Sequence, residues 1–203
     1  MKTVTAVNDA KRILQPANTN RKLGNGKLRI TKGKWKGMPL YQLVLEERKT
    51  CPTTCQQWSN CYGNNMYLAK RIDHTDSSFL SSLWTELSTL AAANPAGFVV
   101  RLHVLGDFYS VSYVNFWAKA LKKFTNLRVF GYTHRLPTTS IGKAVSKLNA
   151  AGAWVRFSDT GGEMSANVNG EGIQCPQETG KTESCLTCGL CWSTTKPIAF
   201  RPH

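Results

Sequence analysis

The fold class follows from residues 98–106, which read Phe-Val-Val-Arg-Leu-His-Val-Leu-Gly. The run is apolar and rich in β-branched side chains, and Gly106 interrupts it. A short apolar run of this kind, bounded by a glycine, is typical of a buried strand, which we expect over Phe98–Leu105. A polar segment follows at once, so the carboxyl end of this strand is a candidate site.

One face of the expected strand is polar. Strict alternation of side chains places Arg101 and His103 on the same face, and Arg156 alternates similarly in Trp154–Ser158. Such side chains do not belong in a dry core, so the sequence predicts a polar cavity or an anionic ligand on that side. A hydrogen-bonded core histidine is the alternative for His103.

Helices and strands alternate around this run. Apolar residues with helical spacing follow a Ser77/Ser78 cap and stop before Pro95 and Gly97. The other expected helices run from Ser110 to about Phe124 and over Thr138–Ala150, and the other strands are Leu28–Thr31, Tyr41–Leu45, Leu127–Tyr132 and Trp154–Ser158. Alternation of this kind predicts parallel strands with right-handed crossovers. Because a full eightfold barrel needs about 250 residues, we predict an α/β fold with a partial, open β/α barrel-like parallel sheet of three or four strands.

The 203 residues suit one domain, and a hydrophobic content of 41% excludes general disorder. The net charge is +14, and residues 1–50 hold 12 basic and 3 acidic side chains. We therefore expect a basic, loop-rich segment over residues 1–37 and a single α/β domain over 38–203. Trp35 lies among lysines, as in single-stranded nucleic-acid surfaces, so this segment is expected to contact nucleic acid. A solvated basic loop is the alternative.

The chain shows no membrane or export signal. No stretch approaches eighteen uncharged apolar residues, and the first residues lack an apolar signal core. We expect a cytoplasmic protein with no membrane partner. In that compartment thiols stay reduced, so clustered cysteines indicate metal binding more than disulfides.

Seven cysteines fall into two segments, 51–61 and 175–192. The second segment contains Cys185-x-x-Cys188-x-x-Cys191 with Cys175 as a lone fourth thiol. A contiguous triplet is typical of iron–sulfur clusters. Zinc usually takes two separate Cys-x-x-Cys pairs and fits less well. Cysteines without any metal are the remaining alternative.

The first segment contains Cys51, Cys55 and Cys61. Three thiolates leave one iron open, an arrangement that resembles radical S-adenosylmethionine enzymes, although the usual Cys-x3-Cys-x2-Cys pattern has a shorter second gap. The resemblance implies S-adenosylmethionine binding by the turn Gly161-Gly162-Glu163, which here follows the last expected strand instead of an early one. One cluster shared between the two segments is a further alternative.

Polar side chains follow three expected strands, where α/β sheets place their sites. We predict that Asp107, Thr133, Arg135 and Asp159 line a substrate pocket as catalytic residues. Asp107 could instead cap the helix beginning near Ser110. His134, which follows an expected strand, and His203, the last residue, are two further candidate site residues.

The sequence resembles the gene product eighty-eight family of small phage and plasmid proteins. The resemblance covers about residue 40 to the end, and its marks are Cys51-Pro-Thr-Thr-Cys55 with Cys61-Tyr62, Gly106-Asp-Phe-Tyr-Ser110 with Tyr113 and Trp117, Tyr132-Thr-x-Arg135, Thr187-Cys-Gly-Leu-Cys-Trp192 and Ala199-Phe-Arg-Pro-His203. It implies a metal centre and a phage or mobile-element origin, and hence a host-cell cytoplasm.

Three functions agree with these observations. The first is an iron–sulfur protein with one or two [4Fe–4S] clusters and radical S-adenosylmethionine-like or redox activity on an unidentified small-molecule or macromolecular substrate. The second is a non-catalytic binding protein, stapled by an iron–sulfur cluster or zinc, whose basic N-terminus contacts nucleic acid or a host protein. The third is a ferredoxin-like electron-transfer protein. The sequence leaves open whether the chain is an enzyme.

Overall fold

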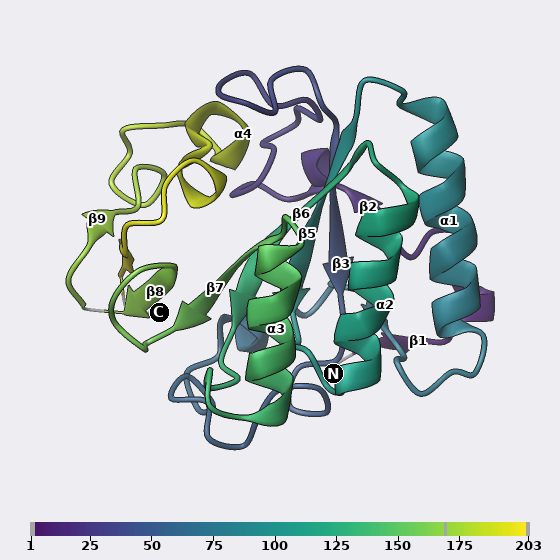
Figure 1. The fold of residues 1–203 in the computed structure, drawn as a ribbon, viewed down its shortest axis with the longest axis horizontal. Coiled ribbons are helices and arrows are strands. Elements are labelled where there is room, and N and C mark those ends of the chain that lie inside the picture. Colours follow the sequence, from purple (N-terminus) through teal and green to yellow (C-terminus); the bar gives the residue numbers. More distant parts are fainter. Residues whose placement is uncertain (1–2, 169, 202–203) are drawn as a thin grey trace.

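The computed structural model describes residues 3–168 and 170–201, so His203 lies outside the described residues. An eight-stranded sheet in the order β2-β3-β5-β6-β7-β8-β10-β9 forms the centre (Figure 1). Its strands are β2 (Gln15–Pro16), β3 (Leu40–Val44), β5 (Phe98–Leu105), β6 (Leu127–Thr133), β7 (Trp154–Ser158), β8 (Ser165–Val168), β9 (Ile173–Gln174) and β10 (Ile198–Phe200). Only β2 is antiparallel to its neighbour. A separate parallel pair joins β1 (Val4–Thr5) to β4 (Arg71–Ile72).

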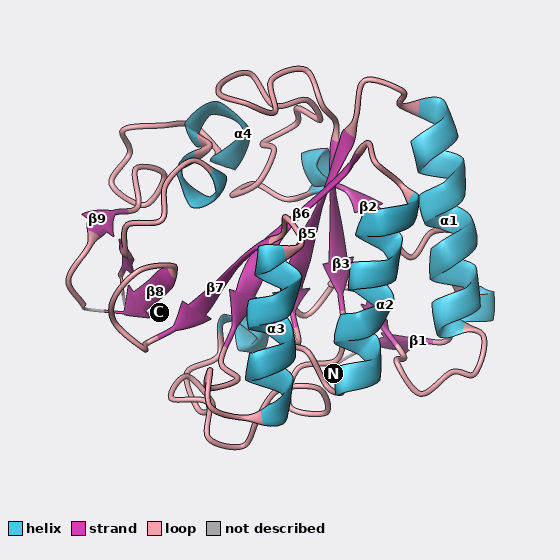
Figure 2. Cartoon of the chain, in the orientation of Figure 1, coloured by secondary structure: helices cyan, strands magenta, loops and turns pink. Residues whose placement is uncertain are grey.

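Three helices, α1 (Phe79–Ala93), α2 (Val111–Lys123) and α3 (Ser140–Ala150), lie side by side along the sheet (Figure 2). The short helix α4 (Cys185–Cys188) lies apart from them, in the Cys-rich C-terminal segment. Single 3-10 turns complete the structure: η1 (Val7–Asp9), η2 (Ala17–Thr19), η3 (Tyr62–Asn65) and η4 (Leu190–Trp192).

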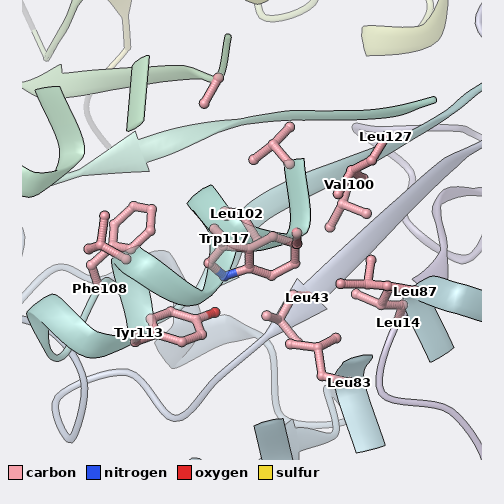
Figure 3. Packing of buried hydrophobic residues seen from close by; sticks show 14 of the residues in the cluster. Leu14, Leu43, Leu83, Leu87, Val100, Leu102, Phe108, Tyr113, Trp117 and Leu127 are labelled. Atoms are coloured by element: carbon pink, nitrogen blue, oxygen red, sulfur yellow. The ribbon is translucent and has the colours of Figure 1, made fainter. Parts of the chain in front are cut away.

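The local sequence explains α2. The Ser110 side chain accepts a hydrogen bond from the Tyr113 backbone N–H, which satisfies a donor that the first turn leaves free. Tyr113, Trp117 and Ala120 lie on one face and are fully buried. They join a core between the helices and the sheet that also contains Leu43, Leu83, Leu87, Val100 and Leu102 (Figure 3). Helix formation here depends mainly on burial of this face.

The predicted α/β fold with a parallel sheet is confirmed, and the long elements agree with the sequence. β5 and β7 have the expected bounds, and α2 begins after its expected cap. The expected strand Leu28–Thr31 is reduced to one bridge between Arg29 and Pro39. The sheet has eight strands instead of three or four, because β8, β10 and β9 extend it beyond β7 and β2 adds a strand beyond β3. Across the described residues it stays open, with edges at β2 and β9.

Strict alternation along β5 is wrong for His103. Between the pairs Gln42–Arg101 and Val44–Leu105, β5 holds more residues than β3, so the register shifts there. As a result, Arg101 lies over the Tyr132 ring, whereas the His103 ring packs against Phe108 on the helix side. The two side chains therefore have different ring neighbours, although both line the cavity described below.

The N-terminal segment packs into both sides of the molecule. Leu14 joins the core beneath the helices, near Leu43 and Leu87 (Figure 3). Trp35 belongs to a second core on the other side of the sheet and stacks on Trp192 at 5.2 Å between ring centroids. The boundary at residue 37 stays a prediction, but residues on its N-terminal side contribute to both cores.

Candidate functional site

A cavity of about 970 Å³ opens at the carboxyl ends of β3, β5, β6 and β7. The segment between β3 and β4 forms one wall, and residues around β2 and η2 form another. Of the residues proposed from the sequence, the cavity is lined by Cys51, Cys55, Cys61, Asp107 and Asp159. Arg101, His103 and His134 also line it. A volume of this size suits a substrate or cofactor pocket.

Asp107 and Thr133 connect the ends of two adjacent strands. The Thr133 hydroxyl donates to Asp107 Oδ1 at 2.7 Å, and the His134 backbone N–H donates to Oδ2 at 2.8 Å. Asp107 also accepts from the backbone N–H of Phe108 at 2.6 Å. Burial raises the pKa of the Asp107 carboxyl, while these hydrogen bonds oppose the shift. Its contacts are to the Phe108 and His134 backbone, so it does not cap α2, whose cap is Ser110.

Arg135 contacts the same segment from outside the cavity. Its Nε donates to the Phe108 carbonyl at 2.8 Å, and a terminal nitrogen donates to the Thr50 carbonyl at 2.6 Å. The Thr50 hydroxyl accepts from the Asp107 N–H at 3.1 Å. Neither Thr133 nor Arg135 lines the cavity. Both therefore position the strand ends and the cysteine loop.

His134 and Asp159 form a pair on the cavity wall. His134 Nε2 lies 3.6 Å from Asp159 Oδ2, beyond hydrogen-bond reach, and neither atom has a hydrogen-bond partner among the described residues. Asp159 Oδ1 accepts from the Val168 N–H at 2.8 Å, which fixes the carboxylate. An imidazole beside a carboxylate can transfer a proton to a bound molecule. The sequence indicated each residue separately but gave no signal that they meet.

The N-terminal cysteines belong to the loop after β3. Burial raises the pKa of the Cys51 thiol to about 12, and it also raises that of Cys55. A buried ion pair anchors the loop: Arg71 binds the Glu47 carboxylate at 2.7 and 3.0 Å, and it also donates to the Gly63 carbonyl. The anchoring holds the three thiols at the cavity.

The C-terminal cysteines lie elsewhere. Cys175, Cys185, Cys188 and Cys191 line a second, small cavity of about 10 Å³ together with Trp192. The Tyr132 hydroxyl donates to Cys191 Sγ at 2.8 Å. Arg156 holds the segment to the sheet by donating to the carbonyls of Ser165, Cys191, Thr194 and Lys196. The two cysteine groups therefore line two different cavities.

The turn Gly161-Gly162-Glu163 is exposed and lies outside the residues that line either cavity. Both of its glycines have positive φ angles, 68° and 71°, and the turn carries the chain from β7 to β8. The structure therefore places it apart from the three thiols' cavity.

Two lysines of the basic N-terminal segment pair with glutamates of the C-terminal segment. Lys22 binds Glu178 at 2.6 Å, and Lys27 binds Glu183 at 2.7 Å. Trp35 is 3% exposed, so its ring is not available to stack on a base. The lysines of the expected aromatic and basic surface are exposed, but its tryptophan is not. Lys34 lies over the Trp154 ring.

Comparison with known proteins places this site in a family. Residues 12–158 match the family described as Gene product 88, a span that contains the cavity's three cysteines, Asp107 and His134. The chain belongs to the gene product 88 family. It is 23% identical over 166 residues to the "Gene 88 protein" of Mycobacterium phage D29, which covers 68% of this chain and 69% of that protein. No solved structure matches.

The gene product 88 match begins earlier than expected and ends before the C-terminal cysteines. A phage protein among its relatives supports a bacteriophage origin. In the part of this family member that the structure describes, no helix is long and apolar enough to cross a membrane.

Proposed function

We propose that the cavity is the substrate site of an iron–sulfur protein, with a [4Fe–4S] cluster bound by Cys51, Cys55 and Cys61. The supporting observation is that three thiols from one anchored loop line the same cavity as Asp107 and the His134–Asp159 pair. Open α/β sheets bind ligands at the carboxyl ends of their strands. The arrangement therefore joins cluster ligands and acid–base groups around one space.

The donor set fits such a group chemically, because soft thiolates are the ligands that iron–sulfur clusters take. Within residues 3–168 and 170–201, no three His, Cys, Asp or Glu side chains lie close enough together to hold a metal ion. Ligation would therefore draw the thiols together. It would also release protons, since the buried thiols of Cys51 and Cys55 have raised pKa values and metal binding requires thiolates.

When bound, the cluster supplies one-electron chemistry. The chain supplies the remaining functions of the site. The His134–Asp159 pair moves a proton to or from the substrate, and Asp107 holds the two strand ends in register beside it. Three protein ligands leave one iron without a thiolate, and S-adenosylmethionine is the cosubstrate proposed for it. We also propose that the open sheet is a partial barrel distantly similar to the cores of radical S-adenosylmethionine enzymes.

The C-terminal cysteines form a second proposed metal site. Its cavity of about 10 Å³ holds roughly one water-sized sphere, which suits a single ion better than a four-iron cluster. Four thiols are a usual zinc ligand set. Zinc is therefore our proposal at this position, and a second [4Fe–4S] cluster is the alternative outcome.

Two other functions remain as proposals. A non-catalytic protein would use the metal only to stabilise its fold and would contact nucleic acid or a host protein through exposed basic residues such as Lys32 and Lys36. A ferredoxin-like protein would exchange single electrons and would not require the His134–Asp159 pair. In either case the cytoplasm is the proposed location.

Metal analysis tests the proposal. The full chain, purified without oxygen, should contain about four irons and four sulfides per chain. Cys55→Ser should lose most of this iron, whereas the matched variant Cys188→Ser should keep it and lose zinc. Zinc without sulfide in the wild type, or equal iron in wild type and Cys55→Ser, would exclude a cluster in the first cavity.

A second measurement separates the enzyme from the alternatives. Added S-adenosylmethionine should change the electron paramagnetic resonance spectrum of the reduced, iron-loaded chain. An unchanged spectrum at full iron content would rule out the cosubstrate. Reversible one-electron reduction that is equal in wild type and Asp159→Asn would favour the ferredoxin-like function.

A further inference from the structure

Three of the arginines in the interior have acceptors for their side-chain nitrogens. Arg71 binds the Glu47 carboxylate through two nitrogens, and Arg156 donates to four backbone carbonyls. Arg135 donates to two further carbonyls. This is the usual state of a buried guanidinium, because removing its charge from water is costly unless the donors are satisfied.

Arg101 differs from these three. It lines the large cavity, and its Nε is buried without a hydrogen-bond partner. In the part of the chain that the structure describes, no carboxylate forms an ion pair with it. It forms a cation–π interaction, with the guanidinium carbon 5.6 Å from the centre of the Tyr132 ring. The guanidinium therefore lines the cavity without a carboxylate partner among the described residues, and its electrostatic neighbours are the hydroxyls of Tyr62 and Tyr132 and the thiols of Cys185 and Cys191.

The surroundings of Arg101 are cationic and aromatic. Tyr132 packs edge-on against Phe200 at 5.7 Å between ring centroids, and Lys22 Nζ lies 5.2 Å from the centre of the Phe200 ring. Both Lys22 and Phe200 line the same cavity. Lys22 is paired with Glu178 at 2.6 Å, whereas Arg101 is the cavity-lining cation with a buried nitrogen that lacks a hydrogen-bond partner among the described residues.

The acidic groups that face the cavity come from other positions. Asp107 is held by Thr133 and by the backbone at the ends of β5 and β6, Asp159 lies beside His134, and Glu47 is bound by Arg71. None of the three forms an ion pair with Arg101 among the described residues. The cavity thus has one wall with an unpaired cation and another with acid–base groups and thiols.

We infer that Arg101 binds an oxyanion of the substrate, a phosphate or a carboxylate group. A guanidinium offers a planar fork of donors that matches both groups, and such charge-assisted hydrogen bonds are strong when water is excluded. The inference rests on the proposed function, because it takes the cavity as the substrate site. It adds that the substrate is anionic and that its anionic group lies against β5 and β6.

Calorimetric titration of the full chain tests the inference. The probes are inorganic phosphate, pyrophosphate and succinate at constant ionic strength. The wild type should bind at least one probe saturably, and Arg101→Gln should bind it at least about tenfold more weakly. Stronger binding of the phosphate probes identifies a phosphate ligand, and stronger binding of succinate identifies a carboxylate.

Two variants control the titration. Lys123→Gln removes one positive charge from an exposed position on α2 and should bind like the wild type. Arg101→Lys keeps the charge but lacks the planar fork, so it should bind with intermediate affinity, and it decides the result if Arg101→Gln does not fold. The inference would be overturned if the wild type, Arg101→Lys and Arg101→Gln all bound the probe with equal affinity. It would also be overturned if the folded wild type bound none of the probes.

Iron content separates this inference from the proposed function. If anion binding fails in a chain that keeps its cluster, only the inference is wrong. If anion binding depends on Arg101 in a chain that takes up no iron, the cluster is wrong and the anion site stands.

Discussion

His103 is a buried histidine whose neutral form the fold requires. Its Nε2 lies 2.9 Å from the Tyr113 hydroxyl, and burial together with nearby Arg101 lowers its pKa to about 3. An unfolded histidine has a pKa near 6.5. The folded chain therefore binds fewer protons below that pH, so the stabilisation is complete above pH 6.5 and is lost as the pH falls toward 3.

His103→Gln tests this pH dependence, because glutamine keeps a hydrogen-bonding group but does not titrate. Between pH 7 and pH 5 the wild type should lose about 2 kcal/mol more unfolding free energy than the variant. Urea unfolding at both pH values measures the difference. Parallel losses in the two proteins would show that His103 is not buried in its neutral form.

At the scale of one element, α3 needs a glycine near its start. Thr139 caps the helix by accepting from the Gly142 N–H at 3.0 Å, and a Cβ on Gly142 would lie 2.0 Å from the Leu136 carbonyl oxygen. Alanine gains about 1 kcal/mol of helix propensity over glycine, but overpacking against backbone costs typically 1–3 kcal/mol. The clash has the larger effect.

Gly142→Ala should therefore destabilise the protein by up to about 2 kcal/mol. Lys143→Ala, at the exposed next position of the same helix, is the matched control and should change stability little. Thermal unfolding of both variants checks the sign. A rise in stability for Gly142→Ala would show that the helix start can move away from Leu136.

The elements also show how far sequence reasoning reaches. β5 and α2 were predictable because a long apolar run and a capped amphipathic pattern each give a strong local signal. β9 has two residues and β10 has three, and both depend on neighbours distant in sequence, so no local pattern indicates them. The same applies to the site. Asp107 and Asp159 were found from their strand ends, whereas the unpartnered Nε of Arg101 depends on which acceptors the fold places nearby.

At the scale of the whole molecule, the N-terminal and C-terminal segments support each other. The backbone N–H groups of Cys185 and Leu186 donate to the carbonyls of Lys22 and Leu23, and Trp35 stacks on Trp192. Trp35→Ala would leave a cavity in this contact, at a cost of about 3–5 kcal/mol. The C-terminal cysteine segment should then open locally.

Limited proteolysis can detect that opening. Trp35→Ala should be cleaved within residues 176–190 several times faster than the wild type, because cleavage follows local opening. Lys36→Ala, at the exposed neighbouring position, should be cleaved at the wild-type rate. Faster cleavage confined to the helices α1 to α3 would contradict the contact described here.

The position of β10 in the sheet determines the order in which the strands can pair during translation. β10 pairs with β8 on one side and β9 on the other, although both precede it in the chain. Until the ribosome has made residues 198–200, β9 has no strand to pair with, and Val168 lacks its pairing partner Phe200. The nascent chain can complete β3 to β7 beforehand. Phe200 also lines the cavity, so during translation the cavity acquires its full wall only after the sheet is otherwise built.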